Sequence, residues 1–163
     1  RLKETDTEGI PVRLYADPAY SLKQLYGIEQ MLTQALAQKV YLSSGGYLVI
    51  EPTEALTVVD VNTGKNVAKK EMQENFLRVN KEAAEEIARQ LRLRNLSGMV
   101  LVDFINLISK SAEEELLKTF RAALQKDPVP AQLIDMTALG LVEVTRKKIK
   151  RPLHEIFPDG LGF

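Results

Sequence analysis

The sequence predicts an α/β domain in which a mixed β-sheet packs against helices. Stretches with apolar residues at helical spacing alternate along the chain with short β-branched runs bounded by turn residues. The predicted order is a strand, a helix, three strands, a helix, a strand, a helix and two strands. Because 163 residues suit one domain, we expect residues 1–163 to form a single unit with its own core.

The N-terminal half begins with a short predicted strand, Ile10–Tyr15, in which apolar and polar residues alternate. Asp17 and Pro18 favour a helix start, as N-cap and first helical residue. The apolar stripe beyond them predicts a helix from Tyr20 to about Ala37. Three predicted strands separated by turn residues follow: Lys39–Leu42, Tyr47–Ile50 and Ala55–Val61.

The C-terminal half contains the strongest helical pattern, Glu74–Leu93, which carries a broad apolar face. The run Met99–Ile105 is apolar apart from Asp103, a pattern typical of a central strand covered on both faces. The remaining predicted elements are a helix over Ser111–Gln125 and strands over Gln132–Met136 and Leu141–Thr145.

The composition excludes several classes of chemistry. The chain has no cysteine, which excludes disulfides, thiolate nucleophiles and Cys-ligated zinc, and its one histidine, His154, excludes a His-pair metal motif. Lys and Arg number 22, as do Asp and Glu, and this balance argues against a domain devoted only to polyanion binding. No apolar run approaches the ~20 residues of a membrane span, and the charged start lacks a signal-peptide pattern. We therefore expect a soluble, cytoplasmic protein.

Two aspartates stand out because each interrupts an apolar strand near its end. Asp60 follows Val58-Val59, and Asp103 follows Val100-Leu101-Val102. Two strand-end carboxylates that converge can hold a hard cation such as Mg²⁺, with water completing its coordination. Asn62 shares a face with Asp60 if the strand continues, and it can orient a metal-bound water or a phosphate. The alternative, equally compatible with the spacing, is that each aspartate caps a loop or pairs with a basic neighbour.

Basic residues gather in two segments. The loop Thr63–Lys70 contains Lys65 and two further lysines, and Arg146–Arg151 has five basic residues among six. Such segments can contact an RNA backbone without reading its sequence, so Lys65, Arg146 and Lys147 are candidate RNA contacts. The alternative for both segments is an ordinary solvated surface.

Several sequence blocks are distinctive as an ordered set. They are Ser44–Ile50, Pro52–Thr57 and Val59–Gly64; Asn80–Gly98 with Val102–Ile105; and Leu139–Lys147. In this order they resemble the catalytic core of the ribonuclease E/G family. The resemblance extends from about Val12 to Leu153, nearly the whole chain.

The resemblance implies a deoxyribonuclease-I-like subdomain that holds Mg²⁺ between two aspartates, matching Asp60 and Asp103. An asparagine that helps to orient the site matches Asn62. The implied reaction is endonucleolytic cleavage of single-stranded, A/U-rich RNA, in which a metal-bound water attacks phosphorus and leaves 5′-phosphate and 3′-hydroxyl ends. Single-stranded RNA is the implied partner, and a homo-oligomer is compatible with the full-length protein.

The chain departs from the family pattern after Asp103. Where the family usually reads Asp-Phe-Ile-Asp-Met, Asn106 replaces the second carboxylate, which lowers the negative charge near the expected metal. Nothing in the chain resembles the family's N-terminal oligonucleotide-binding barrel, its 5′-monophosphate sensor or its Cys-containing zinc link. We therefore expect a fragment that carries the catalytic subdomain alone. The alternative is a non-catalytic RNA-binding or assembly module with the same fold.

Overall fold

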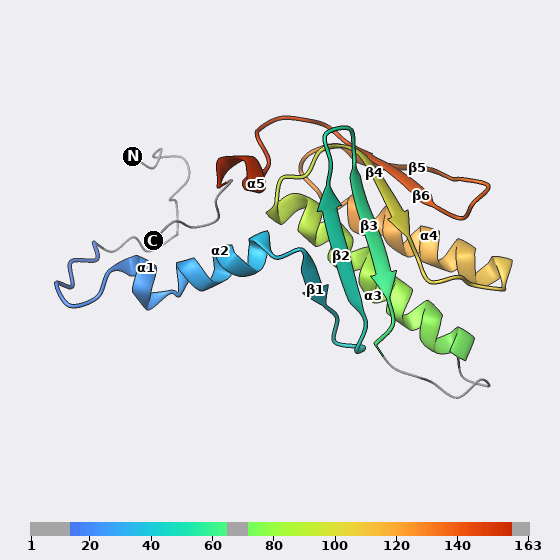
Figure 1. The fold of residues 1–163 in the computed structure, drawn as a ribbon, viewed down its shortest axis with the longest axis horizontal. Helices are drawn as coiled ribbons and strands as arrows, with labels where there is room; N and C mark the ends of the chain where they lie inside the picture. Colours follow the sequence, from blue (N-terminus) through green and yellow to red (C-terminus); the bar gives the residue numbers. More distant parts are fainter. Residues whose placement is uncertain (1–13, 65–71, 158–163) are drawn as a thin grey trace.

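A six-stranded mixed sheet forms the centre of the domain (Figure 1). The structure is a computed structural model that describes residues 14–64 and 72–157. The strands lie in the order β1-β2-β3-β4-β6-β5, and only β3 and β4 are parallel neighbours. Their bounds are β1 Lys39–Tyr41, β2 Tyr47–Pro52, β3 Thr57–Asn62, β4 Gly98–Asp103, β5 Ala131–Met136 and β6 Val142–Arg146. The predicted mixed α/β architecture is confirmed, and it is consistent with a deoxyribonuclease-I-like subdomain.

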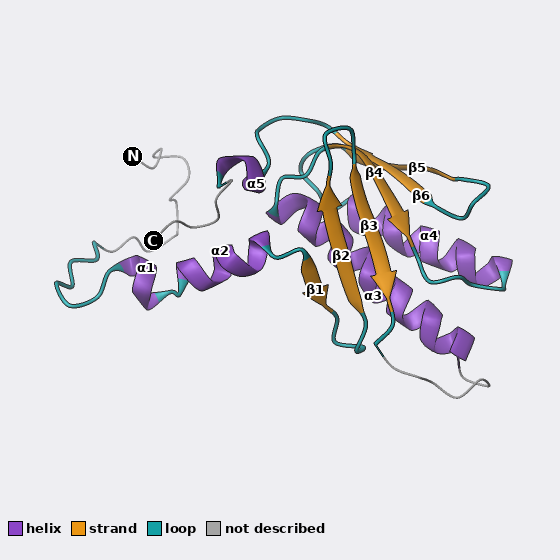
Figure 2. Ribbon diagram, in the orientation of Figure 1, coloured by secondary structure: helices purple, strands orange, loops and turns teal. Residues whose placement is uncertain are grey.

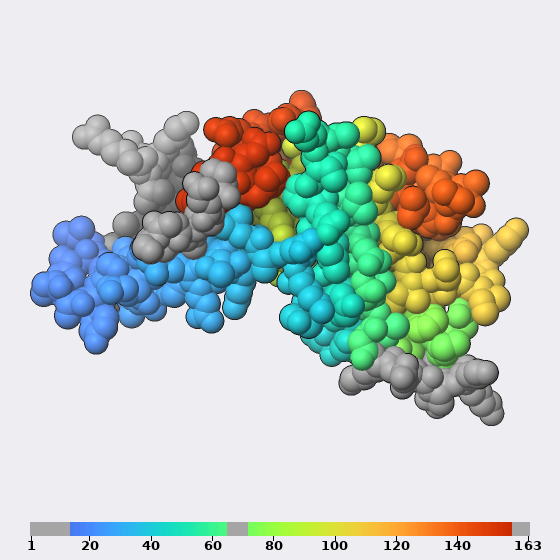
Figure 3. All heavy atoms as spheres, viewed as in Figure 1, coloured from blue at the N-terminus to red at the C-terminus, as the bar shows by residue number. Residues whose placement is uncertain are grey.

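Helices α3 (Met72–Leu93) and α4 (Lys110–Leu124) lie against one face of the sheet, so the domain has two layers (Figure 2). The alternation along β3 fits this arrangement, because Val59 and Val61 are buried whereas Asp60 between them is exposed. Among the helices of the described segments, none lies over the opposite face, which we call the open face. Figure 3 views this face, with β2 and β3 at its surface in teal and green.

The expectation that the strand within Met99–Ile105 is covered on both faces is therefore wrong. Its inward residues Val100 and Val102 are buried, but Met99 is exposed and Leu101 is only half-buried on the open face. The continuous apolar run concealed an ordinary alternation, because the outward positions of this strand are also apolar until Asp103.

The core lies between the sheet and the two long helices. Phe120 of α4 is fully buried and meets Phe104 edge-to-face, with ring centroids 5.6 Å apart. Helix α3 contributes a stripe of small and aliphatic residues, including Ala83, Ala84 and Ile87, none of them accessible to solvent. Burying each large apolar side chain stabilises the fold by roughly 1.5–3 kcal/mol, so this interface fixes where α3 lies against β3 and β4.

The predicted helix over residues 20–37 is instead two helices, α1 (Leu22–Leu25) and α2 (Ile28–Leu36). Gly27 separates them with a φ of 58°, a left-handed conformation that glycine adopts without strain. The predicted apolar stripe is present, but Ala35 is its only buried residue in these two helices. This stripe extends beside the sheet and contributes little to the core.

Two other terminal features differ from the sequence prediction. Most of the predicted strand Ile10–Tyr15 lies outside the described residues, and Leu14 and Tyr15 are not in a strand. Near the C-terminus a short helix, α5 (Leu153–Ile156), is joined to the end of α3 by a bond from the Leu153 amide to the Arg94 carbonyl (2.8 Å). None of the helices in residues 14–64 and 72–157 has the length and apolarity needed to cross a bilayer.

A buried ion pair connects the end of β6 to the loop after α4. Arg146 is 4% exposed, and its Nε donates to Asp127 Oδ2 at 2.8 Å. Its Nη1 donates to Asn95 Oδ1 and to the Leu96 carbonyl. Burial alone would raise the pKa of Asp127, but hydrogen bonds from Arg146 and from the Val129 amide outweigh it and hold that pKa below its ordinary value. The pair is a structural element of the fold.

We expect Asp127→Asn to destabilise the domain by about 3–5 kcal/mol, because it leaves the Arg146 guanidinium buried without its countercharge. Glu155→Gln is the matched control, since Glu155 pairs with Arg151 at the surface and its loss should cost less than ~1 kcal/mol. Urea unfolding at neutral pH measures both. Similar costs for the two variants would contradict this account.

The same pair predicts a pH dependence. The pKa of Asp127 is lowered in the folded state. The stability that its ionised form contributes is therefore fully present above the ordinary carboxyl pKa, and it is lost as the pH falls through the pKa of the folded state. The parent should therefore lose more stability than Asp127→Asn over that acidic range.

Candidate functional site

The parallel register of β3 and β4 places Asp60 beside Asp103. The two residues are Cα partners in adjacent strands, which lie about 4.8 Å apart in a sheet. Both are exposed and both follow a buried valine, Val59 or Val102, so both side chains are on the open face. The sequence prediction that these carboxylates converge at strand ends agrees with this geometry. They are not buried, so their charge needs no partner within the core.

Asn62 holds one of the two carboxylates. Its Nδ2 donates to Asp60 Oδ2 at 2.7 Å, and the two residues share a face because they are two positions apart in β3. A fixed carboxylate orientation is what a coordinating oxygen needs. Asn62 therefore acts on Asp60 directly, a more specific role than the general orienting one expected from the sequence.

The donor set fits Mg²⁺ better than it fits more demanding cations. Within the described segments, no group of three or more His, Cys, Asp or Glu side chains is arranged to hold a metal. Mg²⁺ typically binds through one or two carboxylates and keeps several waters, and Asp60 and Asp103 supply that number. Ca²⁺ takes six to eight oxygen ligands, and structural zinc takes four Cys or His ligands.

The turn between β1 and β2 packs tightly against the end of β3. A Cβ on Gly46 would lie 2.7 Å from the Asn62 carbonyl oxygen, and a Cβ on Gly64 would lie 2.3 Å from the Gly45 carbonyl oxygen. Only glycine fits at either position without moving backbone. The close approach fixes the backbone on which Asn62 stands.

Glu82 of α3 forms hydrogen bonds to the same turn. Its carboxylate accepts from the Ser43 amide at 2.6 Å and from the Ser44 amide at 2.9 Å. Burial raises the pKa of Glu82, but the hydrogen bonds from Ser44 and Ser43 outweigh it, and the net pKa is lowered. The helix that crosses between β3 and β4 thus also anchors the β1–β2 turn.

Asn80, two residues before Glu82 in α3, anchors the segment that leaves β4. Its Nδ2 donates to the Ile105 carbonyl at 2.7 Å, and its Oδ1 accepts from the Ile105 amide at 3.0 Å. The side chain is fully buried. Sequence reasoning missed Asn80 and Glu82, although a lone amide within the apolar stripe of α3 is a recognisable signal.

The basic candidates do not gather at the carboxylates. Lys65 lies outside the described residues. Arg146 is buried in its pair with Asp127, a placement that does not fit the predicted RNA contact. Lys147 is exposed, but it follows the β6 residue that pairs with Gly98. That end of β4 is about 16 Å from Asp103 along the strand.

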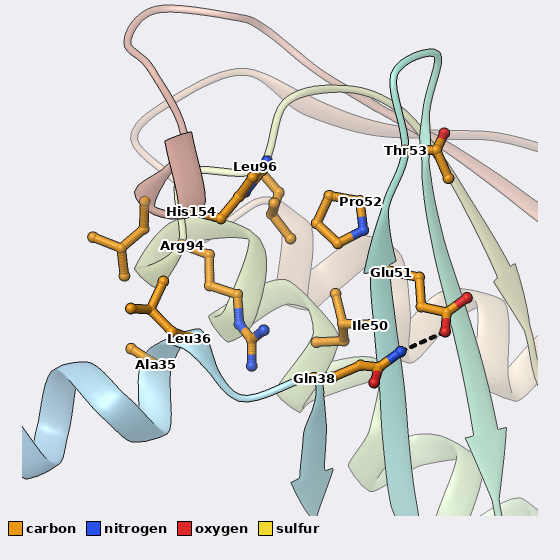
Figure 4. A pocket seen from close by; sticks show the side chains of 11 residues that line it. Ala35, Leu36, Gln38, Ile50, Glu51, Pro52, Thr53, Arg94, Leu96 and His154 are labelled. Atoms are coloured by element: carbon orange, nitrogen blue, oxygen red, sulfur yellow. Dashed lines mark hydrogen bonds between the residues drawn. The ribbon is translucent and has the colours of Figure 1, made fainter. Parts of the chain in front are cut away.

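The cavity in Figure 4 is also separate from the carboxylates. It has a volume of about 410 Å³ and lies between α2, β2 and the end of α3. Its polar lining includes the Arg94 guanidinium and the pair formed by Gln38 and Glu51. Arg94 donates from Nε to Gln90, which in turn donates to Glu86, so its charge is compensated through α3. Burial lowers the pKa of Arg94.

Comparisons with known proteins agree with the resemblance seen in the sequence. Residues 2–149 match the ribonuclease E/G family. The chain belongs to that family. It is 46% identical over 136 residues to ribonuclease E of Nostoc sp., which covers 83% of this chain and 20% of that protein. It is 42% identical over 132 residues to ribonuclease G of Escherichia coli K12, which covers 81% of this chain and 27% of that protein.

Ribonuclease E of Synechocystis sp. is 41% identical over 150 residues, 92% of this chain and 22% of that protein. The chain therefore spans about a fifth to a quarter of the length of these ribonuclease E/G relatives. Membership of the family is established, and the aspartates on which the resemblance depended are neighbours on one face of one sheet.

Asn106, the residue that departs from the family pattern, is exposed in the segment between β4 and α4. Asn80 anchors that segment at Ile105, directly before it. The departure therefore affects the surface beyond the strand end and leaves the pairing of Asp60 with Asp103 unchanged.

We expect Glu82→Gln to lower the free energy of unfolding by about 1–2 kcal/mol, because two hydrogen bonds to a carboxylate become weaker bonds to an amide. Amide hydrogen exchange of Ser43 and Ser44 should accelerate. Glu85→Gln is the matched control, since Glu85 is exposed on the same helix. Equal exchange rates in the two variants would show that the turn does not depend on Glu82.

Proposed function

We propose that this chain carries the metal-dependent active site of an endoribonuclease that hydrolyses single-stranded RNA. The observation that carries the proposal is the side-by-side placement of Asp60 and Asp103 in a member of the ribonuclease E/G family. Relatives named ribonuclease E and ribonuclease G support the activity. The cofactor proposed is Mg²⁺, held by these two carboxylates.

The chemistry assigned to each residue follows from its position. Asp60 and Asp103 would hold Mg²⁺, which would supply Lewis-acid stabilisation of charge on the scissile phosphate and activation of the attacking water. Asn62 keeps the Asp60 carboxylate in one orientation through its 2.7 Å hydrogen bond. Both carboxylates are exposed on the open face, where an extended strand of RNA would lie.

The side-chain inventory supports hydrolysis by water over catalysis by a protein nucleophile. The chain has no cysteine and one histidine. His154 lies in α5, whose first residue, Leu153, bonds to the end of α3. The chain enters β4 there, at the end of the strand opposite to Asp103, so His154 is not placed to act as a general base on an RNA held at Asp60 and Asp103.

The proposed products have 5′-phosphate and 3′-hydroxyl ends. Water attacks phosphorus, a new P–O bond forms, and the bond between phosphorus and the 3′ oxygen breaks. The 3′ oxygen receives a proton and leaves as a hydroxyl on the upstream fragment. The RNA 2′-hydroxyl takes no part in this bond exchange.

A second candidate is a non-catalytic RNA-binding or assembly module with the same fold. Asn106 favours it, because the amide removes a negative charge that the family pattern places near the metal. Mg²⁺-dependent cleavage of a single-stranded A/U-rich RNA separates the two candidates, since the module would bind RNA without cleaving it.

We expect Asp60→Asn and Asp103→Asn each to reduce cleavage by about 100-fold or more, since loss of a ligand removes several kcal/mol of transition-state stabilisation. Both should also lose the rise in melting temperature that Mg²⁺ causes in the parent. Asp135→Asn is the control, because Asp135 is exposed on β5, two strands away from β4. A parent-like response to Mg²⁺ in Asp103→Asn would show that there is no shared site.

Arg146 is buried, so four basic residues of the segment Arg146–Arg151, which we call the basic tail, are exposed and available to RNA. They are Lys147, Lys148, Lys150 and Arg151. Each phosphate contact contributes roughly 0.7 to the slope of log K against log salt for a single strand. We expect Lys147→Ala to lower that slope by about 0.7, whereas Lys118→Ala, on the exposed side of α4, leaves it unchanged. An unchanged slope in Lys147→Ala would exclude a phosphate contact by Lys147.

A further inference from the structure

Two tyrosines and a lysine lie on the open face beside the carboxylates. Tyr41 of β1 pairs with Tyr47 of β2, which pairs with Asn62 of β3. These three residues form one row across the sheet. A second row runs from Lys39 through Val49 and Asp60 to Asp103. The two rows are two positions apart along the strands, so the aromatic rings and the carboxylates lie on the same face and near the same end.

The side chains of Tyr41, Tyr47 and Lys39 form a compact cluster, which we call the tyrosine platform. The ring centroids of Tyr41 and Tyr47 are 6.3 Å apart and their planes are inclined at 56°. The Lys39 Nζ lies 3.6 Å from the centroid of Tyr47 and 5.1 Å from that of Tyr41. Both distances are within the range of cation–π attraction.

The cluster contributes little to the core. Tyr41 is 75% exposed and stands on β1, a three-residue strand at the edge of the sheet. Its neighbour Val40 points the other way and packs against the core. Val40 is half-buried there, whereas the Tyr41 ring has much of its surface open to a ligand.

The platform is close enough to serve the same strand of RNA as the carboxylates. Tyr47 is directly opposite Asn62, and opposite residues of an antiparallel pair have Cβ atoms about 4.5–5.5 Å apart. Tyr41 lies one strand further, about 10 Å from β3. Asn62 is itself bonded to Asp60. A nucleotide next to one held at Asp60 and Asp103 can therefore reach the rings.

We propose that the tyrosine platform stacks a nucleobase of single-stranded RNA adjacent to the scissile phosphate. Tyr41 provides the accessible ring and Tyr47 packs beside it. The positive charge of Lys39 attracts the RNA backbone and makes cation–π contacts with both rings. Exposed aromatic rings with a nearby cation are the usual means of holding single-stranded nucleic acid without sequence preference. The proposal rests on the proposed function and adds a positioning site to it.

Tyr41→Ala tests the stacking contact, with Tyr41→Phe to retain the ring and Tyr26→Ala as a matched control. Tyr26 is similarly exposed, at the end of α1 and away from the sheet. The full chain binds a single-stranded A/U oligoribonucleotide in EDTA, and a 2-aminopurine moved along the RNA reports stacking by fluorescence quenching. A second oligonucleotide, otherwise identical, lacks the base at the position where quenching is observed.

We expect Tyr41→Ala to bind about 5- to 150-fold more weakly and to lose the quenching at one position. Tyr41→Phe and Tyr26→Ala should bind as the parent does. The oligonucleotide without the base should bind the parent as weakly as intact RNA binds Tyr41→Ala, and the two losses should not add. Steady-state cleavage with Mg²⁺ should show a higher KM with little change in kcat.

Failure of the platform and failure of the proposed function give different results. If Tyr41→Ala binds and quenches as the parent does while Asp103→Asn abolishes cleavage, the platform is wrong and the nuclease proposal stands. If Tyr41→Phe is as weak as Tyr41→Ala, the hydroxyl and not the ring makes the contact, and stacking is overturned. If the parent neither binds nor cleaves single-stranded RNA, both proposals are wrong.

Discussion

The parallel pairing of β3 with β4 is the constraint on which the site depends. Parallel neighbours end at the same edge of a sheet, so Asp60 and Asp103, far apart in sequence, become adjacent. Such a pairing requires a long connection across one face, and α3 provides it. The same helix then anchors the backbone on both sides of the carboxylates, through Glu82 at the β1–β2 turn and Asn80 at Ile105. The crossover that the parallel pairing requires is therefore also the element that anchors the site.

The open face, which no described helix covers, changes how the carboxylates are accommodated. A buried carboxylate needs a partner before the protein can fold, whereas Asp60 and Asp103 are exposed and remain hydrated. Their exposed side chains are accessible to a cation from solvent. Among the described residues the buried ion pair is Arg146 with Asp127, and it lies at the opposite end of β4.

Much of this fold and part of the site could be predicted from the sequence. The strand-end positions of Asp60 and Asp103 followed from the apolar runs they interrupt, and those runs became β3 and β4. The burial of Arg146 was harder to foresee, because its position in a basic run suggests solvent. Its alternation with Val142 and Val144 places it on the core side of β6, but its partner Asp127 is contributed by a loop that no periodicity describes.

The tyrosines were missed for a related reason. Tyr41 and Tyr47 read as ordinary strand residues, and only the register shows that they share a row with Asn62. The exposed basic tail leaves the sheet at the other end of β4, about 16 Å away. A strand of RNA crossing the open face perpendicular to the strands meets the tyrosines and the carboxylates in succession, and it reaches the tail only if it turns along the strands. Ring stacking depends weakly on salt, whereas phosphate contacts depend on it steeply. Positioning at the site and electrostatic attraction by the tail are thus physically separate contributions within one small domain.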